Sequence, residues 1–358
     1  MRRKLSLPLM TDIAQNMPLS RSKAALPALG TWLGWVAFMV FLMVIVGGAT
    51  RLTNSGLSIT EWDPVFGAIP PLNATDWNIL FLKYQQSSQY KLQNVGMSLT
   101  QFQFIFWWEW AHRLLGRLIG FVFLIPFLYF AVMRKLELRL VPRLIILFVL
   151  GGLQGALGWY MVASGLVNRV DVSQYRLAAH LTLASALFAA IIWTISSLNW
   201  RHKFPRNFDA WTALILFVLV LLQIAAGGFV AGIDAGQGYN TWPLMDGKYI
   251  PDGLSVMQPV WHNLFENALT VQFDHRILAY TIFIIAVLHA VKTFSFTSML
   301  LAYLVFIQAG LGIMTLLMYV PLGFALAHQA TAMLVLAAAV WNLHKKTIDH
   351  ALFFQDIA

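Results

Sequence analysis

Long apolar runs dominate the pattern of hydrophobic and polar positions along this chain. A run of about 20 apolar residues is long enough for an α-helix to cross the hydrocarbon core of a membrane. Runs of this kind lie at roughly 32–50, 104–133, 144–166, 177–199, 210–232, 268–291, 298–319 and 322–343. The last two belong to one uncharged stretch, which the turn residues around Pro321 divide. The pattern therefore predicts eight transmembrane helices.

The two halves of the chain carry the same landmarks in the same order. The matched positions are Gly47-Gly48, Asn54, Gly56 and Trp62 with Gly227-Gly228, Asp234, Gly236 and Trp242; His112-Arg113 with His275-Arg276; Gln154 and Gly158 with Gln308 and Gly312; and His180 with His328. Each repeat holds four spans, an even number, so the halves share one orientation in the membrane. The predicted fold is an all-α integral membrane protein, built as two tandem four-helix bundles related by a pseudo-twofold axis along the membrane normal.

Loop charges orient these spans, because Lys and Arg accumulate on the cytoplasmic side of a membrane. With the N-terminus inside, fifteen of the 24 Lys and Arg residues fall in inner segments. The first thirty residues contain no apolar core and no small-residue cleavage site, so we do not expect a secretory signal there. The predicted organisation is a cytoplasmic N-terminal segment 1–31, a first half 32–199, a cytoplasmic linker 200–209, a second half 210–343 and a cytoplasmic tail 344–358.

Composition agrees with a membrane protein and removes several kinds of chemistry. Hydrophobic residues make up 59% of the chain and charged residues 11%, which leaves too little polar surface for soluble domains. The net charge of +9 is interpreted as a topology signal, and no nucleic-acid partner is expected. The chain has no cysteine, which excludes disulfides, thiolate zinc sites, iron–sulfur clusters and cysteine nucleophiles.

Four of the nine histidines occupy a recurring position. His112, His180, His275 and His328 each lie near the start of an even-numbered span, and the loop charges place all four toward the outer face. A polar side chain in a span is costly and usually faces the protein interior or a functional pathway. Polar segments, a loop or a helix end account for the other five, which are His202, His262, His289, His344 and His350.

Paired histidines predict haem. Two histidines on neighbouring helices of a four-helix bundle can each give one axial nitrogen to haem iron, so one pair in each half predicts two haem sites. Copper or zinc fits less well, because those ions need three or four converging ligands. We expect Arg113 and Arg276, with Arg117 one turn further on, to neutralise haem propionates. The alternative for these arginines is snorkelling to the membrane interface.

One residue breaks the symmetry of the repeat. Glu109 lies three residues before His112, whereas Gln272 lies three residues before His275. A carboxylate beside a metal site can transfer a proton or stabilise a cation, and glutamine can do neither. We therefore expect catalysis in the first half. The alternative is that Glu109 lies in the interfacial aromatic belt and only pairs with Arg113.

Seven segments together resemble the haem A synthase family. They are GGATRLTNSGLSITEWDPVFGAIPP (47–71), FIFWWEWAHRLLGR (104–117), LQGALGWYMVASGL (153–166), RLAAHLTLA (176–184), VAGIDAGQGYNTWPLMDGKYIP (230–251), FENALTVQFDHR (265–276) and AHQATAM (327–333). The resemblance implies an enzyme that oxidises the C8 methyl group of haem O to a formyl group, which gives haem A for terminal cytochrome oxidases. Part of the family carries a cysteine pair in the first outer loop, so this chain resembles the cysteine-free branch.

Site residues follow from the resemblance by motif. Glu109 matches the family's catalytic glutamate, and His112 and His180 match the pair around the substrate, haem O. His275 and His328 match the ligands of a resident haem b. The resemblance also implies two successive hydroxylations of the methyl carbon, after which the geminal diol loses water.

Further expectations concern the surroundings of the protein. The resemblance implies haem O synthase and cytochrome oxidase assembly factors as partners, together with an electron donor that the sequence does not identify. The expected location is the bacterial cytoplasmic membrane, with the mitochondrial inner membrane as the alternative. Large apolar faces are compatible with a homo-oligomer.

Two other functions use some of the same features. A dihaem b-type electron-transfer cytochrome, for example a quinol-linked one, would use the four histidines but would not need Glu109. A transporter made of two four-span repeats would explain the duplication, but not the placement of all four histidines near one face.

Overall fold

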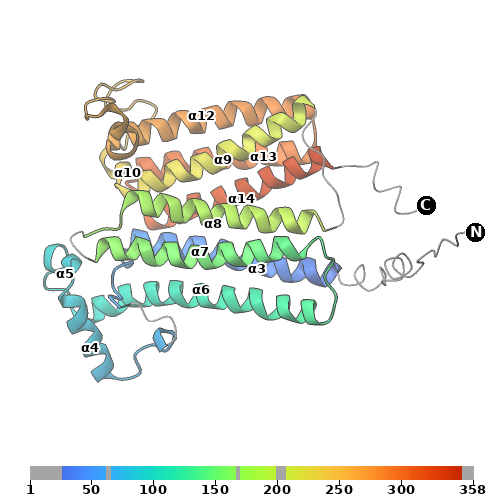
Figure 1. Cartoon of the computed structure of the whole chain (residues 1–358). Helices are drawn as coiled ribbons and strands as arrows, with labels where there is room; N and C mark the ends of the chain where they lie inside the picture. The colour runs from blue at the N-terminus through green and yellow to red at the C-terminus, as the bar shows by residue number, and fades with distance from the viewer. Residues whose placement is uncertain (1–25, 62–65, 167–169, 199–206, 349–358) are drawn as a thin grey trace, which may run out of the picture.

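Helices account for the architecture of the computed structural model, which describes residues 26–61, 66–166, 170–198 and 207–348. Eight helices in these ranges are long and apolar enough to cross a membrane, as predicted, and the described residues contain no strand. Their bounds are α3 Leu26–Leu52, α6 Leu99–Val132, α7 Val141–Gly165, α8 Gln174–Ser196, α9 Phe208–Gly232, α12 Ala268–Thr293, α13 Phe296–Leu317 and α14 Leu322–Thr347 (Figure 1). The sequence therefore predicted the number and order of these helices.

Shorter helices lie in the connections. The connection between α3 and α6 contains η1 (Phe66–Ala68), α4 (Ala74–Gln85) and α5 (Ser88–Leu92), and the one between α9 and α12 contains α10 (Ala235–Gly238), η2 (Val260–His262) and α11 (Asn263–Glu266). Figure 1 shows α4, α5 and α10 at one end of the bundle, opposite the end where α3 begins and α14 finishes. The end that carries these connections is called the loop end below.

Several spans extend beyond the predicted apolar runs. The start of α6 at Leu99 is five residues earlier than predicted, because Ser98 and Gln101 form a capping box there. The last turn of α14 carries His344, Lys345 and Lys346, since basic residues suit the carboxyl end of a helix. His344 is therefore buried within a helix, and not in a polar segment as predicted. Trp62, His202, His350 and parts of the predicted segments 1–31, 200–209 and 344–358 lie outside the described residues.

Helix contacts form a closed ring within each half. In the first half α3 and α7 each contact both α6 and α8, so α6 and α8 lie diagonally across the ring. In the second half α9 and α13 each contact both α12 and α14, which makes α12 and α14 the diagonal pair. The halves meet where α8 packs on α9 and α14, and where α14 packs on α3. The pseudo-twofold axis between the halves stays a prediction.

The second glycine of each Gly-Gly pair lies where the halves meet. A Cβ atom at Gly228 would come within 2.8 Å of the Cα atom of Ala178 in α8. At Gly48 a Cβ atom would collide with the side chain of Gln329 in α14, whose Nε2 donates to the carbonyl of Val44 over 2.8 Å. Glycine at these two positions allows a helix of the other half to approach closely.

We expect Gly228→Ala to destabilise the protein by about 1–3 kcal/mol, because the backbone at Ala178 cannot move away from an added methyl group. The measurement is the thermal unfolding midpoint of the purified protein in detergent. Gly152→Ala is the matched control, because no atom lies within 4 Å of a Cβ at that position of α7. Equal midpoints for the two variants would contradict the proposed contact.

Candidate functional site

All four histidines of the repeat lie toward the loop end of the bundle. His112, His180, His275 and His328 fall in the first half of α6, α8, α12 and α14, and these helices all begin at the loop end (Figure 1). His112 and His180 are close enough to interact electrostatically, and so are His275 and His328. The structure therefore brings together the two predicted pairs.

The members of each pair come from diagonal helices, and not from neighbouring helices as predicted. Neighbouring helices pack with their axes about 8–10 Å apart, so their side chains fill the space between them. Diagonal helices face each other across the centre of the ring. A flat group held between two histidines would lie in that central space.

A glycine of an adjacent helix lies directly against each of these four imidazole rings. From a Cβ atom built at the glycine, the distance to the histidine Cε1 would be 2.8 Å for Gly47 and His112, 3.0 Å for Gly158 and His180, 3.3 Å for Gly227 and His275, and 2.8 Å for Gly312 and His328. A larger residue would push the ring out of its place. Sequence reasoning found these glycines in the repeat but did not pair them with the histidines.

Glutamine side chains contact three of the four rings. The Nε2 atoms of Gln154 and Gln223 lie 3.1 Å from Nδ1 of His180 and His275, and Nε2 of Gln308 lies 3.4 Å from Nε2 of His328. Gln223 was missed, because its counterpart in the first half, at an offset of 180, is Met43. No such glutamine contact is found at His112 in the part of the chain that the structure describes.

These surroundings fit haem. The side-chain oxygens of the three glutamines and Nδ1 of His328 are buried without a hydrogen-bond partner among the described residues. Within the same residues, no group of three or more His, Cys, Asp and Glu side chains could hold a metal ion. Each half thus offers two imidazoles, which is the ligand set of a six-coordinate haem iron.

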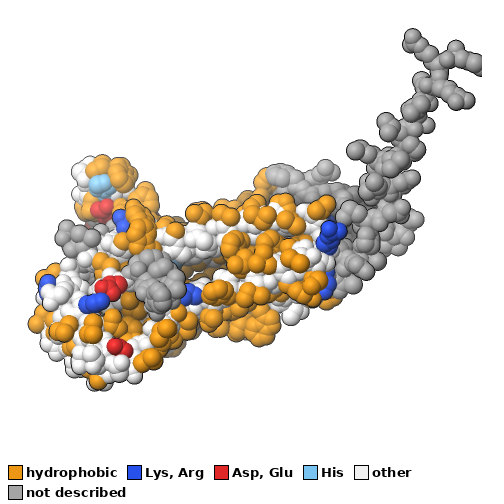
Figure 2. Space-filling view, turned by 60° about the horizontal axis from the view of Figure 1, so that its bottom comes forward, with side chains coloured by type: hydrophobic (Ala, Val, Ile, Leu, Met, Phe, Trp, Pro, Cys, Tyr) orange, Lys and Arg blue, Asp and Glu red, His pale blue; other side chains and the backbone are white. Residues whose placement is uncertain are grey.

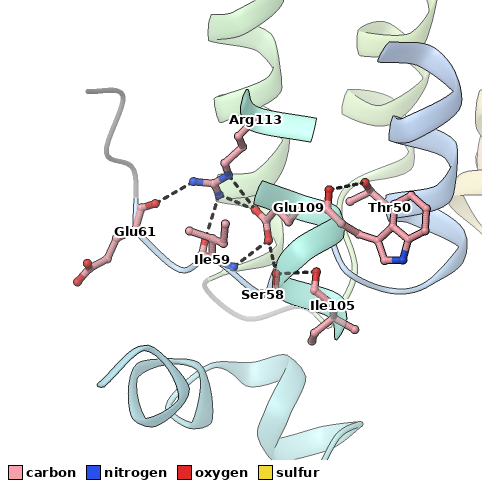
Figure 3. A network of polar contacts seen from close by, with 8 residues as sticks. Thr50, Ser58, Ile59, Glu61, Ile105, Glu109 and Arg113 are labelled. Carbon is pink, nitrogen blue, oxygen red and sulfur yellow. Dashed lines mark hydrogen bonds and ion pairs between the residues drawn. The ribbon is translucent and has the colours of Figure 1, made fainter. Parts of the chain in front are cut away.

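Glu109 of α6 is buried in a network of hydrogen bonds with the start of the connection between α3 and α6 (Figure 3). Its Oε2 accepts hydrogen bonds of 2.8 Å from the Ser58 hydroxyl and from the backbone N–H of Ile59. Its Oε1 accepts from Arg113, over 2.6 Å from Nη2 and 3.1 Å from Nε. The carboxylate therefore holds residues 58 and 59 against α6.

Arg113 completes this network by binding the same connection. Its Nη1 donates to the carbonyl of Glu61 and its Nη2 to the carbonyl of Ile59, both over 2.9 Å. The ion pair between Glu109 and Arg113 that the sequence analysis gave as an alternative is present. The residues Glu109, Arg113, Ser58, Ile59 and Glu61 are called the Glu109 cluster below.

The second half repeats this arrangement without the carboxylate. Arg276 donates to the carbonyl of Tyr239 over 3.1 Å, just as Arg113 donates to Ile59 at the matching position. Gln272 is buried, and its Oε1 has no hydrogen-bond partner in the described ranges. The Nε and Nη1 atoms of Arg276 are also buried and have no partner there. Because the second half has Gln272 where the first half has Glu109, these donors of Arg276 stay available to a ligand.

An apolar cap covers the Glu109 cluster from the loop end. Tyr84 of α4 packs on Phe102 of α6 with the ring centroids 5.2 Å apart, and Trp77 of α4 packs on Phe106. Burial raises the pKa of the Tyr84 hydroxyl, which therefore keeps its proton and donates to Gln89 over 3.0 Å. Figure 3 shows a short helix below the Glu109 cluster. The cap packs on Ile59 of the Glu109 cluster.

Comparison with known proteins identifies the family. Residues 30–340 match the COX15-CtaA family, described as cytochrome oxidase assembly protein. The chain belongs to this family. A haem A synthase of Parvibaculum lavamentivorans is 54% identical over 323 residues, which are 89% of this chain and 94% of the relative. A haem A synthase of Chelativorans sp. is 50% identical over 350 residues, 94% of each chain, and one of Agrobacterium fabrum is 49% identical over 341 residues, 92% of this chain and 93% of the relative.

Membership of the cytochrome oxidase assembly family confirms the resemblance drawn from the motifs. The match includes the four histidines, Glu109 and both large connections at the loop end. The eight apolar helices and the bacterial relatives indicate a multi-pass membrane protein of a bacterium.

Proposed function

We propose that this chain is a haem A synthase, a membrane oxidoreductase that converts haem O to haem A for cytochrome oxidase. The observation that carries the proposal is the pair of matched histidine sites, of which only the first has a buried carboxylate beside it in the described part of the chain. Relatives with this name at about half identity support it over most of the chain. They favour it over a dihaem electron-transfer cytochrome or a transporter.

The two halves have different tasks in this proposal. The second half holds a resident haem b between His275 and His328, because glutamines steady both rings and Arg276 has donors for a propionate. The first half binds haem O between His112 and His180. Because no glutamine of the described residues contacts His112, this pair suits a haem that must enter and leave.

Glu109 acts on the substrate in the first half. In each of two successive hydroxylations, a C–H bond of the haem O methyl group is replaced by a C–OH bond and two electrons pass from that carbon to an external oxidant. The geminal diol then loses water to give the aldehyde. When bound, haem supplies the redox chemistry, and the protein supplies orientation and electrostatics. The negative charge of Glu109 stabilises positive charge that develops at the oxidised carbon. Arg113 and the backbone of Ile59 keep the carboxylate in one place, and Arg117, one turn further along α6, serves the propionates of the substrate.

Haem analysis of whole cells tests this function. The chain is expressed together with a haem O synthase in a bacterium that makes haem b but no haem A. The haems are then extracted and separated by chromatography. Haem A is expected only when both proteins are present. Haem O as the sole product would show that this chain is not a haem A synthase.

The loop end is proposed to face outward, with both termini in the cytoplasm. Figure 2 shows apolar side chains along the helices and Lys and Arg side chains at both ends, accompanied in this view by Asp and Glu side chains at the loop end. The basic side chains at the end opposite the loops support a cytoplasmic placement of that end. This orientation places both haem sites near the outer face. The large exposed apolar surface is compatible with a homo-oligomer, and haem O synthase and assembly factors of cytochrome oxidase are the expected partners.

Single-cysteine labelling of intact cells checks this topology, because the chain has no cysteine of its own. We expect Lys91→Cys and Asp252→Cys to react with a thiol reagent that does not cross the membrane. Lys346→Cys is the control and should react only after the cells are broken. Labelling of Lys346→Cys alone in intact cells would reverse the proposed orientation.

A further inference from the structure

A pocket of about 230 Å³ lies on α12 at the loop end. Its walls include Phe273, Arg276, Ile277 and Tyr280 of α12, with Trp242 and Tyr249 of the preceding connection. Most of this lining is aromatic or aliphatic. It is called the α12 pocket below.

The α12 pocket lies on the opposite side of the helix from His275. Its four helical residues are spaced i, i+3, i+4 and i+7, so they form one stripe along α12. At about 100° per residue, the centre of this stripe is roughly 150° around the helix from His275. Ile277 is 46% exposed and Tyr280 40% exposed, so the pocket opens toward the lipid side. Figure 1 shows α12 at the edge of the bundle.

A hydroxyl donor lies at the edge of this pocket. The hydroxyl of Tyr280 accepts a hydrogen bond of 2.9 Å from Nε1 of Trp242, which leaves its own proton free to be donated. A donor at the edge of an aromatic pocket fits a flat ring that carries an oxygen acceptor. An open side toward lipid fits an apolar tail on that ring.

Membrane quinones combine these features. A phospholipid headgroup also has oxygen acceptors, but it is charged and hydrated, and Arg276 is the only cation in the lining of this pocket. The aromatic walls would contact the face of a quinone ring and offer little to a phosphate. The chemistry of the lining therefore favours a quinone over a lipid headgroup.

We propose that the α12 pocket binds a membrane quinol, which is the electron donor of this protein. The inference rests on the proposed function, because the electrons go to the haem b assigned to His275 and His328. The quinol loses two O–H protons to the outer water and becomes the quinone. Its two electrons leave one at a time: each would reduce the ferric haem b, which would pass it on to dioxygen, the external oxidant, before the next electron arrives. The pocket and His275 lie on opposite faces of α12. An α-helix with its side chains is about 10–12 Å in diameter, so the path for electron transfer is short.

Filling the pocket tests the proposal on the purified, haem-loaded protein. Ile277→Trp should weaken the binding of decylubiquinone, measured by calorimetry, at least tenfold and slow the reduction of haem b by decylubiquinol equally. Ile284→Trp, two turns further along the same exposed face, is the matched control and should change neither. Haem b content and reduction by dithionite should be the same in both variants.

A second variant keeps the test independent of the added bulk. Tyr280→Phe retains the ring but removes the donor, and it should also weaken decylubiquinone binding. Unchanged binding in both Ile277→Trp and Tyr280→Phe would overturn the proposal. So would loss of bound phospholipid from Ile277→Trp in a protein that binds no decylubiquinone, because the pocket would then be a lipid site.

The same measurements separate this inference from the proposed function. If cells form haem A but the purified protein does not bind decylubiquinone, only the α12 pocket is wrongly assigned. If cells contain no haem A, the proposed function is wrong, while the decylubiquinone binding of the purified protein still decides the assignment of the α12 pocket.

Discussion

Glu109→Gln is expected to lower haem A formation about ten- to a thousandfold, which corresponds to roughly 1.4–4 kcal/mol of activation free energy. The change copies Gln272 of the second half and removes the charge while nearly keeping the shape. Haem b should stay bound, because Glu109 is not a ligand of the second site. Haem extraction from cells should show haem O or a hydroxylated intermediate in place of haem A.

Ser58→Ala is the control that separates charge from anchoring. It removes one of the four hydrogen bonds to the Glu109 carboxylate and leaves the charge and the Arg113 ion pair in place. If Glu109 only anchors the connection, Ser58→Ala should lower haem A formation to a similar degree. If the charge acts on the substrate, its effect should be much smaller. Gln272→Glu should not create activity in the second half.

Normal haem A formation by Glu109→Gln would contradict the catalytic assignment. The Glu109 cluster would then be a structural anchor, and catalysis in the first half would need another residue.

His275→Ala and His328→Ala are each expected to remove most of the haem b from the purified protein. Each variant deletes one of two axial nitrogens, and the glycine behind the ring cannot supply another ligand. The measurement is the haem b content per protein from extraction and from the absorption spectrum. His262→Ala is the control, because that residue lies in η2 and outside both histidine pairs.

His112→Ala and His180→Ala should give the opposite pattern. These variants should keep haem b and lose haem A formation, since they alter the proposed substrate site. Full haem b content in both His275→Ala and His328→Ala would show that the resident haem is not held by the second pair.

The periodic and repeated features of this protein could be predicted from the sequence. Apolar runs of membrane-spanning length determine the eight helices, because every backbone polar group must be satisfied within a helix when no water is present. The repeat singled out His112, His180, His275 and His328, since the duplicated halves keep their landmarks in the same order. The motifs also identified the family, which the comparison confirms.

Contacts between distant segments could not be predicted in this way. Ser58, Ile59 and Glu61 lie in a connection without a periodic pattern, so nothing in their spacing indicates that they bind Glu109 and Arg113. Gln223 was missed because its counterpart in the first half, Met43, is not a glutamine. A long helix also continues beyond its apolar run wherever capping residues allow, as at Ser98.

The sequence by itself singled out the residues that we propose carry the chemistry of this protein, namely four histidines in two matched pairs and one carboxylate without a counterpart. Only the tertiary structure decided how they are arranged: each pair lies on diagonal helices, with a glycine behind every ring. It also decided that the donors of Arg113 bind Glu109 and the backbone, while donors of Arg276 stay unpartnered. The physical reason is that residue spacing sets the face of a helix, whereas packing against other segments sets what that face meets.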